Sequence, residues 1–199
     1  MALSKIQAES MNLADTYAFT GTVTGTPTGA LTKIYTNTLT SDASWIALDN
    51  VFSSTYHSYR ILLKYVVTAN AQIRWRLRSG GGQNVTNYWN TRHRKDQGDT
   101  GWAGYSDNGT GTIDRWDLMG GYEVPNLYHI TFAIDVIGPY SPERTMFVAK
   151  GVGYNGSQGV FFDSYGIHNN TSNFDGFNFY ASAGNARTDT RIELYGYNY

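Results

Sequence analysis

The sequence predicts an all-β fold: an antiparallel jelly-roll-like β-sandwich at residues 31–199, preceded by an extended N-terminal arm at residues 1–30. The chain is rich in residues that favour strands, with 16 Tyr, 9 Phe and 5 Trp, and its 22 Gly suit tight turns. Short segments with a two-residue apolar period recur, whereas no longer window has a capped helical period. Many short strands without helices between them favour a sandwich or jelly roll over a barrel.

The arm is the first element, and it cannot build a core of its own. Its segment AFTGTVTGTPTGA is a run of Gly, Thr and Pro, which is typical of a linker. The arm nevertheless carries more apolar side chains than a free linker usually does, so docking on a partner and a free tail both stay open. The candidate anchoring residues are Leu3, Ile6, Met11, Leu13, Tyr17 and Phe19.

Strand candidates follow from Leu31 onward, separated by turn clusters such as TANA, SGGGQN and GYNGSQG. In chain order they lie at residues 31–36, 44–48, 59–68, 71–78, 112–118, 128–136 and 144–152. The last two candidates, at residues 177–182 and 191–197, flank a polar turn segment. We expect these two to form a closing β-hairpin. Its outward Tyr195 and Tyr197 are candidate subunit contacts, because Tyr is enriched at interfaces.

One strand candidate carries an unusual row of charge. Apolar and basic residues alternate in AQIRWRLR, so three guanidinium groups share one face: Arg74, Arg76 and Arg78. Like charges on one face are unfavourable unless partners neutralise them. Either carboxylates such as Asp114 and Asp117 balance the row, or the row lies at a subunit interface, where Arg is enriched.

Residues 87–109, NYWNTRHRKDQGDTGWAGYSDNG, are the best candidate for a binding loop, because long loops in compact domains are often functional. Aromatic rings stack on sugar rings, and nearby polar side chains bind hydroxyl groups. The alternative is that these rings attach a long loop to the domain. The candidate contacts for a glycan or another partner are Tyr88, Trp89, Arg92, His93, Trp102 and Tyr105.

Several classes of function are disfavoured by the sequence. The chain has no cysteine, which excludes disulfides, thiolate metal sites and cysteine catalysis. Its four histidines are too widely separated to form a metal pair, and no G-x-S-x-G motif is present. We therefore expect no metal, no other cofactor and no enzymatic activity. A net charge of −1 and the lack of a long apolar run predict neither nucleic-acid binding nor membrane insertion.

Three stretches resemble virion structural and tail-fibre-like proteins of bacteriophages that infect marine bacteria and cyanobacteria: NLADTYAFTGTVTG, LDNVFSSTYHSYRILLKY and FDGFNFYASAGNARTDTRIELYGYNY. The resemblance implies a β-rich, usually trimeric appendage module that attaches to other virion proteins through its N-terminal segment. The β domain would face outward on the tail or capsid and contact host-surface polysaccharide. Synthesis would take place in the host cytoplasm.

The chain length departs from that pattern, since 199 residues leave no room for the long shaft of a receptor-binding fibre. A tail adaptor, a short head fibre and a capsid decoration subunit therefore stay open beside a tail-fibre-like subunit. The alternative of another class is a carbohydrate-binding or carbohydrate-cleaving module. Glycoside hydrolysis needs only two carboxyl groups about 5–10 Å apart, which the fold alone could bring together.

Overall fold

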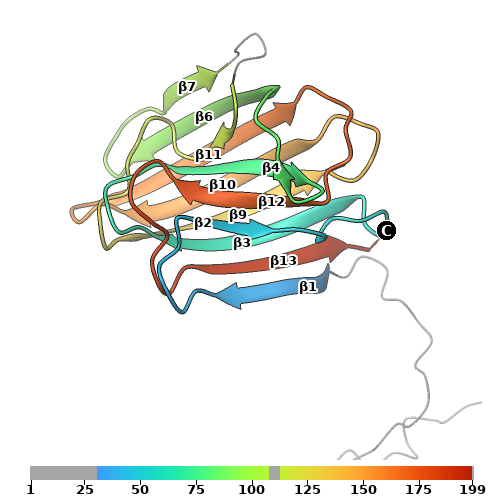
Figure 1. Ribbon diagram of the computed structural model, residues 1–199. Coiled ribbons are helices and arrows are strands. Elements are labelled where there is room, and N and C mark those ends of the chain that lie inside the picture. The colour runs from blue at the N-terminus through green and yellow to red at the C-terminus, as the bar shows by residue number, and fades with distance from the viewer. Residues whose placement is uncertain (1–30, 108–112, 199) are drawn as a thin grey trace, which may run out of the picture.

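The computed structural model describes residues 31–107 and 113–198, which form two antiparallel sheets around one apolar core (Figure 1). The larger sheet has eight strands, in the spatial order β1 (Leu31–Thr38), β13 (Arg191–Tyr197), β3 (Ser58–Val66), β9 (His129–Ile137), β10 (Met146–Tyr154), β11 (Gly159–His168), β6 (Tyr88–Asp96) and β7 (Ala103–Asp107). The smaller sheet has five strands: β2 (Trp45–Leu48), β12 (Gly176–Ala181), β4 (Ile73–Ser79) and β5 (Gly82–Gln83) in that order, with β8 (Trp116–Asp117) also paired to β4.

The predicted all-β sandwich is confirmed, whereas a connectivity of jelly-roll type stays a prediction. In Figure 1 the smaller sheet lies over the central strands of the larger one, and β1 and β7 form the two edges of the larger sheet. The predicted anchoring arm lies outside the described residues, and so do all its candidate anchors: Leu3, Ile6, Met11, Leu13, Tyr17 and Phe19.

The core is built from the inward side chains of both sheets, which alternate with outward ones along each strand. Trp75 on β4 lies at its centre and is fully buried. Its ring centroid lies 4.6 Å from that of Trp116, 5.1 Å from Phe147 and 5.7 Å from Phe179. Aromatic side chains bury more apolar area than any others, so this cluster dominates the packing between the sheets.

The end of the larger sheet near β6 is covered by the segment around β8. Three hydrogen bonds attach that segment to the inner face of the larger sheet. Asn90 Nδ2 donates to the carbonyl oxygen of Asp117 at 2.7 Å, and Ser164 Oγ donates to that of Leu118 at 2.9 Å. The indole Nε1 of Trp116 donates to the carbonyl oxygen of Trp89 at 3.1 Å. The inner face is therefore polar at this end, where main-chain groups of the covering segment face the sheet.

The prediction of a closing β-hairpin is wrong. β12 pairs with β2 and β4 in the smaller sheet, whereas β13 pairs with β1 and β3 in the larger one. The connecting segment crosses the edge of the sandwich, where Ala186 N donates to the carbonyl oxygen of Ala43 at 2.8 Å. The alternating pattern predicts that each segment is a strand, but it does not specify which strand is its neighbour.

The prediction that residues 87–109 form a loop is also wrong, because β6 and β7 form an antiparallel hairpin there. The inward positions of β6 include Asn90, Arg92 and Asp96, so this strand lacks the apolar face that marks a half-buried strand in a sequence. β11 is another strand that the sequence pattern does not predict. Its Gly166 is required by close packing, since an added Cβ would lie 2.1 Å from Cε1 of Phe147.

Candidate functional site

The outer face of the larger sheet carries the largest group of exposed apolar side chains that the sequence reasoning missed. Seven large side chains from β6, β10 and β11 expose between 36% and 48% of their surface there, and we call them the outer apolar face: Trp89, Met146, Val148, Val152, Phe161, Tyr165 and Ile167. Their positions follow from the antiparallel register, in which Val148 stands opposite Tyr165, and Ile167 opposite both Met146 and Trp89. The group spans three neighbouring strands. The ion pair between Lys150 and Asp163 divides it, with Val152 and Phe161 on one side of the pair and the other five side chains on the other.

The sequence holds a signal for this face. On β10, Phe147 and Ala149 are buried in the core, yet the outward Val148 and Val152 are apolar too. β11 repeats the pattern. Strands that are apolar on both faces are usually buried on both faces. The apolar outward residues of β10 and β11 thus predict a layer that covers the outer face of the larger sheet. Within the described part of the chain no such layer lies on them, and their side chains remain exposed.

Several charged residues on this side of the sheet are paired within the chain. Arg60 donates to Asp135 from Nε at 2.8 Å and from Nη2 at 2.7 Å. Tyr197 Oη donates to the same carboxylate at 2.7 Å. Burial raises the pKa of Asp135, but the hydrogen bonds from Arg60 and Tyr197 outweigh it and hold the pKa below its usual range. Lys150 Nζ lies 3.3 Å from Asp163 Oδ1, in the middle of the outer apolar face.

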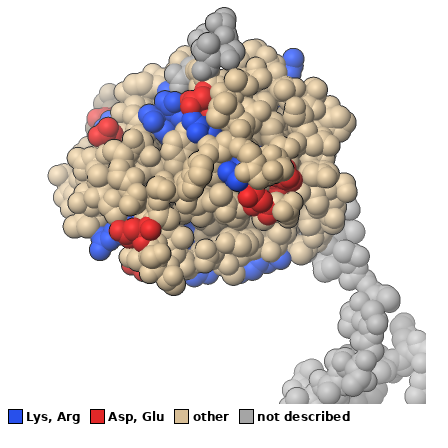
Figure 2. Space-filling view, viewed as in Figure 1, with Lys and Arg blue, Asp and Glu red and all other residues tan. Residues whose placement is uncertain are grey.

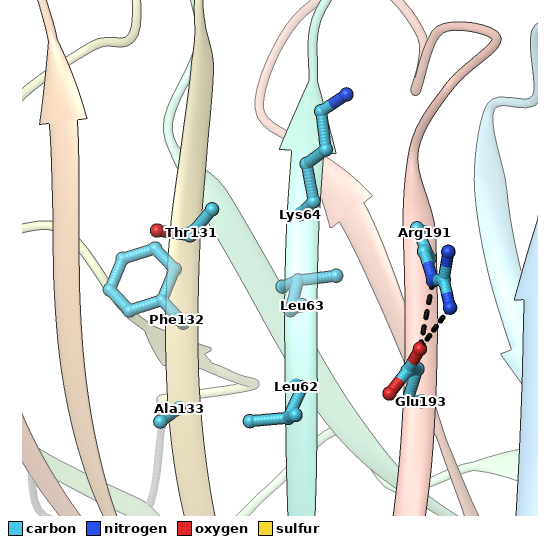
Figure 3. Close-up of a pocket in the computed structure, with 8 residues that line it drawn as sticks. All are labelled: Leu62, Leu63, Lys64, Thr131, Phe132, Ala133, Arg191 and Glu193. Atoms are coloured by element: carbon cyan, nitrogen blue, oxygen red, sulfur yellow. Dashed lines mark hydrogen bonds and ion pairs between the residues drawn. The ribbon is translucent and has the colours of Figure 1, made fainter.

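A shallow depression of about 380 Å³ lies beside the outer apolar face, between β9, β3 and β13 (Figure 3). Leu62 and Ala133 line its apolar part, and Leu62 is 39% exposed. Arg191 and Glu193 form an ion pair at its far side. The depression is therefore a mainly apolar recess in an otherwise flat sheet.

The arginine row lies on the outer face of the smaller sheet, as the alternation in β4 predicts. Arg74 Nε donates to Asp117 Oδ1 at 2.9 Å, and Arg76 donates to the carboxylate of Asp114. The predicted balance of the row by Asp114 and Asp117 is thereby confirmed. Arg78 is buried and paired with Asp49, so its predicted role as a subunit contact is wrong. A subunit contact at Arg74 and Arg76 stays a prediction.

Asp117 is the centre of this ionic network and is almost fully buried, with 8% of its side chain exposed. Its carboxylate accepts hydrogen bonds from three arginines: Arg74 Nε at 2.9 Å, Arg92 Nη1 at 2.6 Å and Arg115 Nε at 3.3 Å. A separate pair joins Arg78 Nε to Asp49 Oδ1 at 2.6 Å. Figure 2 shows the result, with positive and negative side chains side by side in small groups on an otherwise uncharged surface.

The six predicted glycan contacts do not form one patch. Tyr88 and Arg92 are buried on the inner side of β6, so their predicted role as surface contacts is wrong. The hydroxyl of Tyr88 accepts a hydrogen bond from Leu77 N at 2.9 Å and donates to the carbonyl oxygen of Asn84 at 3.1 Å. Side chains of neighbouring residues in a strand point to opposite faces, which explains why one stretch cannot supply a single surface.

The other four predicted contacts lie on different sides of the β6–β7 hairpin. Trp89 and His93 point to the outer side of the larger sheet, where Trp89 belongs to the outer apolar face. Trp102 is 48% exposed in the turn between the two strands. Tyr105 lies opposite Arg92 on the inner side, and its ring packs against Gly120. A contact with a glycan stays a prediction for these four.

Tyr195 and Tyr197 point outward from β13, while Ile192 and Leu194 point into the core, as predicted. Both rings are half-buried by neighbours on the sheet. Lys33 Nζ lies 5.4 Å from the ring centroid of Tyr195, and the guanidinium carbon of Arg60 lies 5.8 Å from that of Tyr197. Their role as subunit contacts stays a prediction.

His168 is the one histidine of the core and lies at the end of β11, fully buried. Its Nε2 lies 3.0 Å from Oδ1 of Asn84 and 3.0 Å from the carbonyl oxygen of Thr86. The rings of Tyr88 and Phe174 pack edge-on against the imidazole at 4.8 Å. Burial lowers the pKa of His168 below 6.5, and hydrogen bonds to the main chain offset only part of this effect. The native imidazole is therefore neutral near pH 7.

We expect the free energy of unfolding to decrease as the pH falls below about 6.5, because the unfolded chain then binds a proton that the native imidazole does not. The decrease approaches about 1.4 kcal/mol per pH unit and ends where the native His168 itself becomes protonated. Urea unfolding between about pH 5 and pH 8 measures it, with His168→Gln compared with the exposed His57→Gln. Equal slopes for the wild type and His168→Gln between about pH 5 and pH 6.5 would contradict this assignment.

Within residues 31–107 and 113–198, no group of three His, Asp or Glu side chains is placed to hold a metal ion. Among these same residues there is also no helix with the length and apolar character needed to cross a membrane. Comparison with protein-family models, with curated proteins and with solved structures found no match to this chain. Its function is therefore inferred from its sequence and from the geometry of the surfaces described above.

Proposed function

We propose that this protein is a non-enzymatic structural subunit of a bacteriophage particle. In this proposal it is an appendage subunit of the tail-fibre or adaptor type, which docks on other virion proteins through residues 1–30 and displays the β-sandwich outside the tail or capsid. A capsid decoration or head-fibre subunit is the alternative of the same class. The resemblance of three stretches to phage virion proteins supports the viral origin.

The observation that most strongly supports a structural role is the outer apolar face. Monomeric soluble proteins rarely expose contiguous apolar patches of more than a few hundred Å², and larger ones usually mark interaction sites. Here the patch lies on the rigid centre of a sheet, where three strands fix its shape. A protein that assembles with others needs a preformed, stable contact surface of this kind.

The acidic side chains also favour a role without catalysis. Cleavage of a glycosidic bond requires one carboxyl group whose raised pKa keeps it protonated and a second that acts as nucleophile or base. Burial raises the pKa of Asp114, but Arg115 and Arg76 outweigh it, so the pKa is lowered. The pKa of Asp135 is lowered as well. Both carboxylates are paired with arginines. Asp114 does line an open pocket of about 380 Å³, but Arg74, Arg92 and Arg115 line the same pocket, so among the described residues it holds no carboxyl group free of a basic partner.

Contact with host-surface glycans is part of this proposal and falls to Trp102, in the turn between β6 and β7. Its side chain is 48% exposed and does not belong to the outer apolar face, whereas Trp89 does. An indole ring offers a flat apolar surface together with an N–H donor, a combination that suits sugars. Display of the sandwich on the particle would bring this ring to the cell surface.

Immunogold labelling of intact virions with an antibody raised against residues 31–199 tests the proposed function. We expect gold at one defined place on the particle. Label on the tail would support the tail-fibre or adaptor role, and label on the capsid would support the decoration role. Particles without label, although the antibody detects the protein in the infected cell, would contradict a virion function.

A further inference from the structure

We propose that the outer apolar face is the surface through which copies of this chain associate with one another. The inference rests on the proposed structural role and names the partner at its main surface. Three properties of the face favour a second copy over other partners: its area, its charge and its shape.

The area matches that of a protein interface. The seven side chains of the outer apolar face, each about 40% exposed, offer on the order of 600 Å² of apolar surface. A stable protein–protein interface buries about 800 Å² on each partner, to which the polar side chains between and around these seven would add the remainder. A single sugar chain or an extended peptide would leave much of this face uncovered.

The charge of the face suits an identical partner. Lys150 and Asp163 lie in its middle and form an ion pair at 3.3 Å, and Arg60 and Asp135 form another beside it. Because these two pairs are balanced within each chain, they can meet in two identical faces without repulsion between like charges. Lys95, which lies opposite Phe161, and Lys64, beside the depression, are basic side chains of this side that the interface would have to leave in solvent. A strongly charged partner would instead need a surface with an excess of one sign.

The shape of the face favours packing of one sheet on another. Sheets stack about 10 Å apart when large and small side chains of the two faces interdigitate. The outer side of the larger sheet offers both kinds: the large Phe161 and Tyr165 stand outward on β11, where Phe161 lies beside Gly159, and the small Ala133 stands outward on β9. The depression of about 380 Å³ at Leu62 provides a recess for a protruding side chain of the facing copy.

The test uses the full chain and one pair of matched substitutions. Val148→Lys places a charge in the centre of the outer apolar face, at a side chain that is 37% exposed. Val85→Lys makes the same change at a side chain that is 50% exposed and follows β5 of the smaller sheet. Sedimentation equilibrium or light scattering after gel filtration measures the particle mass over a series of protein concentrations.

We expect the wild type and Val85→Lys to form oligomers whose mass is a multiple of the 22.2 kDa chain. Val148→Lys is expected to shift the association constant by at least tenfold toward the monomer. Burial of an added ammonium group is unfavourable, and Asp135, which lies opposite position 148, already accepts hydrogen bonds from Arg60 and Tyr197. Its far-ultraviolet circular dichroism and cooperative unfolding should remain, since the side chain points away from the core. Phe161→Lys gives a second, independent variant of the same face.

Two results would overturn the proposal. One is a wild-type chain that stays monomeric at about 100 μM, well above the range in which standard interfaces associate. The other is that the two single variants, Val148→Lys and Phe161→Lys, both fold and both retain the wild-type oligomer. Immunogold label on virions together with a monomeric chain would leave the proposed function in place and remove only the self-association. An oligomer that depends on this face, without label on virions, would leave the self-association in place and remove the proposed virion function.

Discussion

Trp75→Ala is expected to lower the free energy of unfolding by about 3–5 kcal/mol, which is the range for truncating a buried large side chain. The indole of Trp75 is fully buried between the sheets and lies against Trp116, Phe147 and Phe179. Removing it leaves a cavity that three rings held by other strands cannot close. Since domains are stable by only about 5–15 kcal/mol, about a fifth or more of the stability is expected to be lost.

Chemical denaturation followed by far-ultraviolet circular dichroism, at one fixed protein concentration, measures this loss. Trp45→Ala is the matched control, because Trp45 lies in the same sheet but is 47% exposed, and its loss should stay below about 1 kcal/mol. Trp75→Phe separates ring volume from hydrogen bonding, since Nε1 of Trp75 has no hydrogen-bond partner among the described residues. Trp75→Phe should lower the free energy of unfolding by less than about half as much as Trp75→Ala does. Equal losses for Trp75→Ala and Trp45→Ala would show that the centre of the core lies elsewhere.

Asp117→Asn is expected to cost about 3–5 kcal/mol, because it removes one partner from a buried group of charges. Asparagine keeps the shape of the side chain but takes its negative charge away from three arginines. Those guanidinium groups lie close to one another and are themselves mostly buried, with 7% of Arg92 and 23% of Arg74 exposed. The energetic cost comes mainly from the desolvated positive charge that remains, not from the hydrogen bonds that are lost.

The salt dependence of this variant distinguishes charge from packing. Added salt should recover part of the stability of Asp117→Asn, because ions screen the repulsion between the arginines where they reach solvent. Glu143→Gln is the control, since this glutamate forms an exposed pair with His57 at 3.5 Å and should change stability by no more than about 0.5 kcal/mol. A loss for Asp117→Asn no greater than that of Glu143→Gln would refute the role of Asp117 as the centre of the network.

Much of the fold follows from local pattern, because a strand that is half-buried must alternate. β4 is the clearest case: the alternation of Trp75 with Arg74 and Arg76 predicts both the inward ring and the outward charges. Pattern fails where a strand departs from that rule. β6 buries Arg92 against Asp117 and so lacks the expected apolar inner face. The inner face of β11 begins with Val160 and Phe162 but is interrupted by Ser164 and by Gly166 under the ring of Phe147. Only the tertiary neighbours explain these residues.

Which strands pair with one another is harder to predict than which segments form strands. The rings of Phe177 and Phe179 and the side chains of Ile192 and Leu194 all point into the core, as expected for two neighbouring strands of a hairpin. They enter that core from opposite sheets. The outer apolar face was missed for the same reason, since its side chains come from three strands whose adjacency is set by pairing over long stretches of chain.

The strand order has a consequence for how the molecule is made on the ribosome. β1 has one neighbour in the larger sheet, β13, and the register places Leu31 opposite Tyr197. β1 thus has no strand to pair with until nearly the whole described chain has left the exit tunnel. Long-range pairing of this kind forms late and slowly. β1 therefore joins the larger sheet only when synthesis of the domain is nearly complete, so an incomplete chain leaves the edge of that sheet at β3 without its two outer strands.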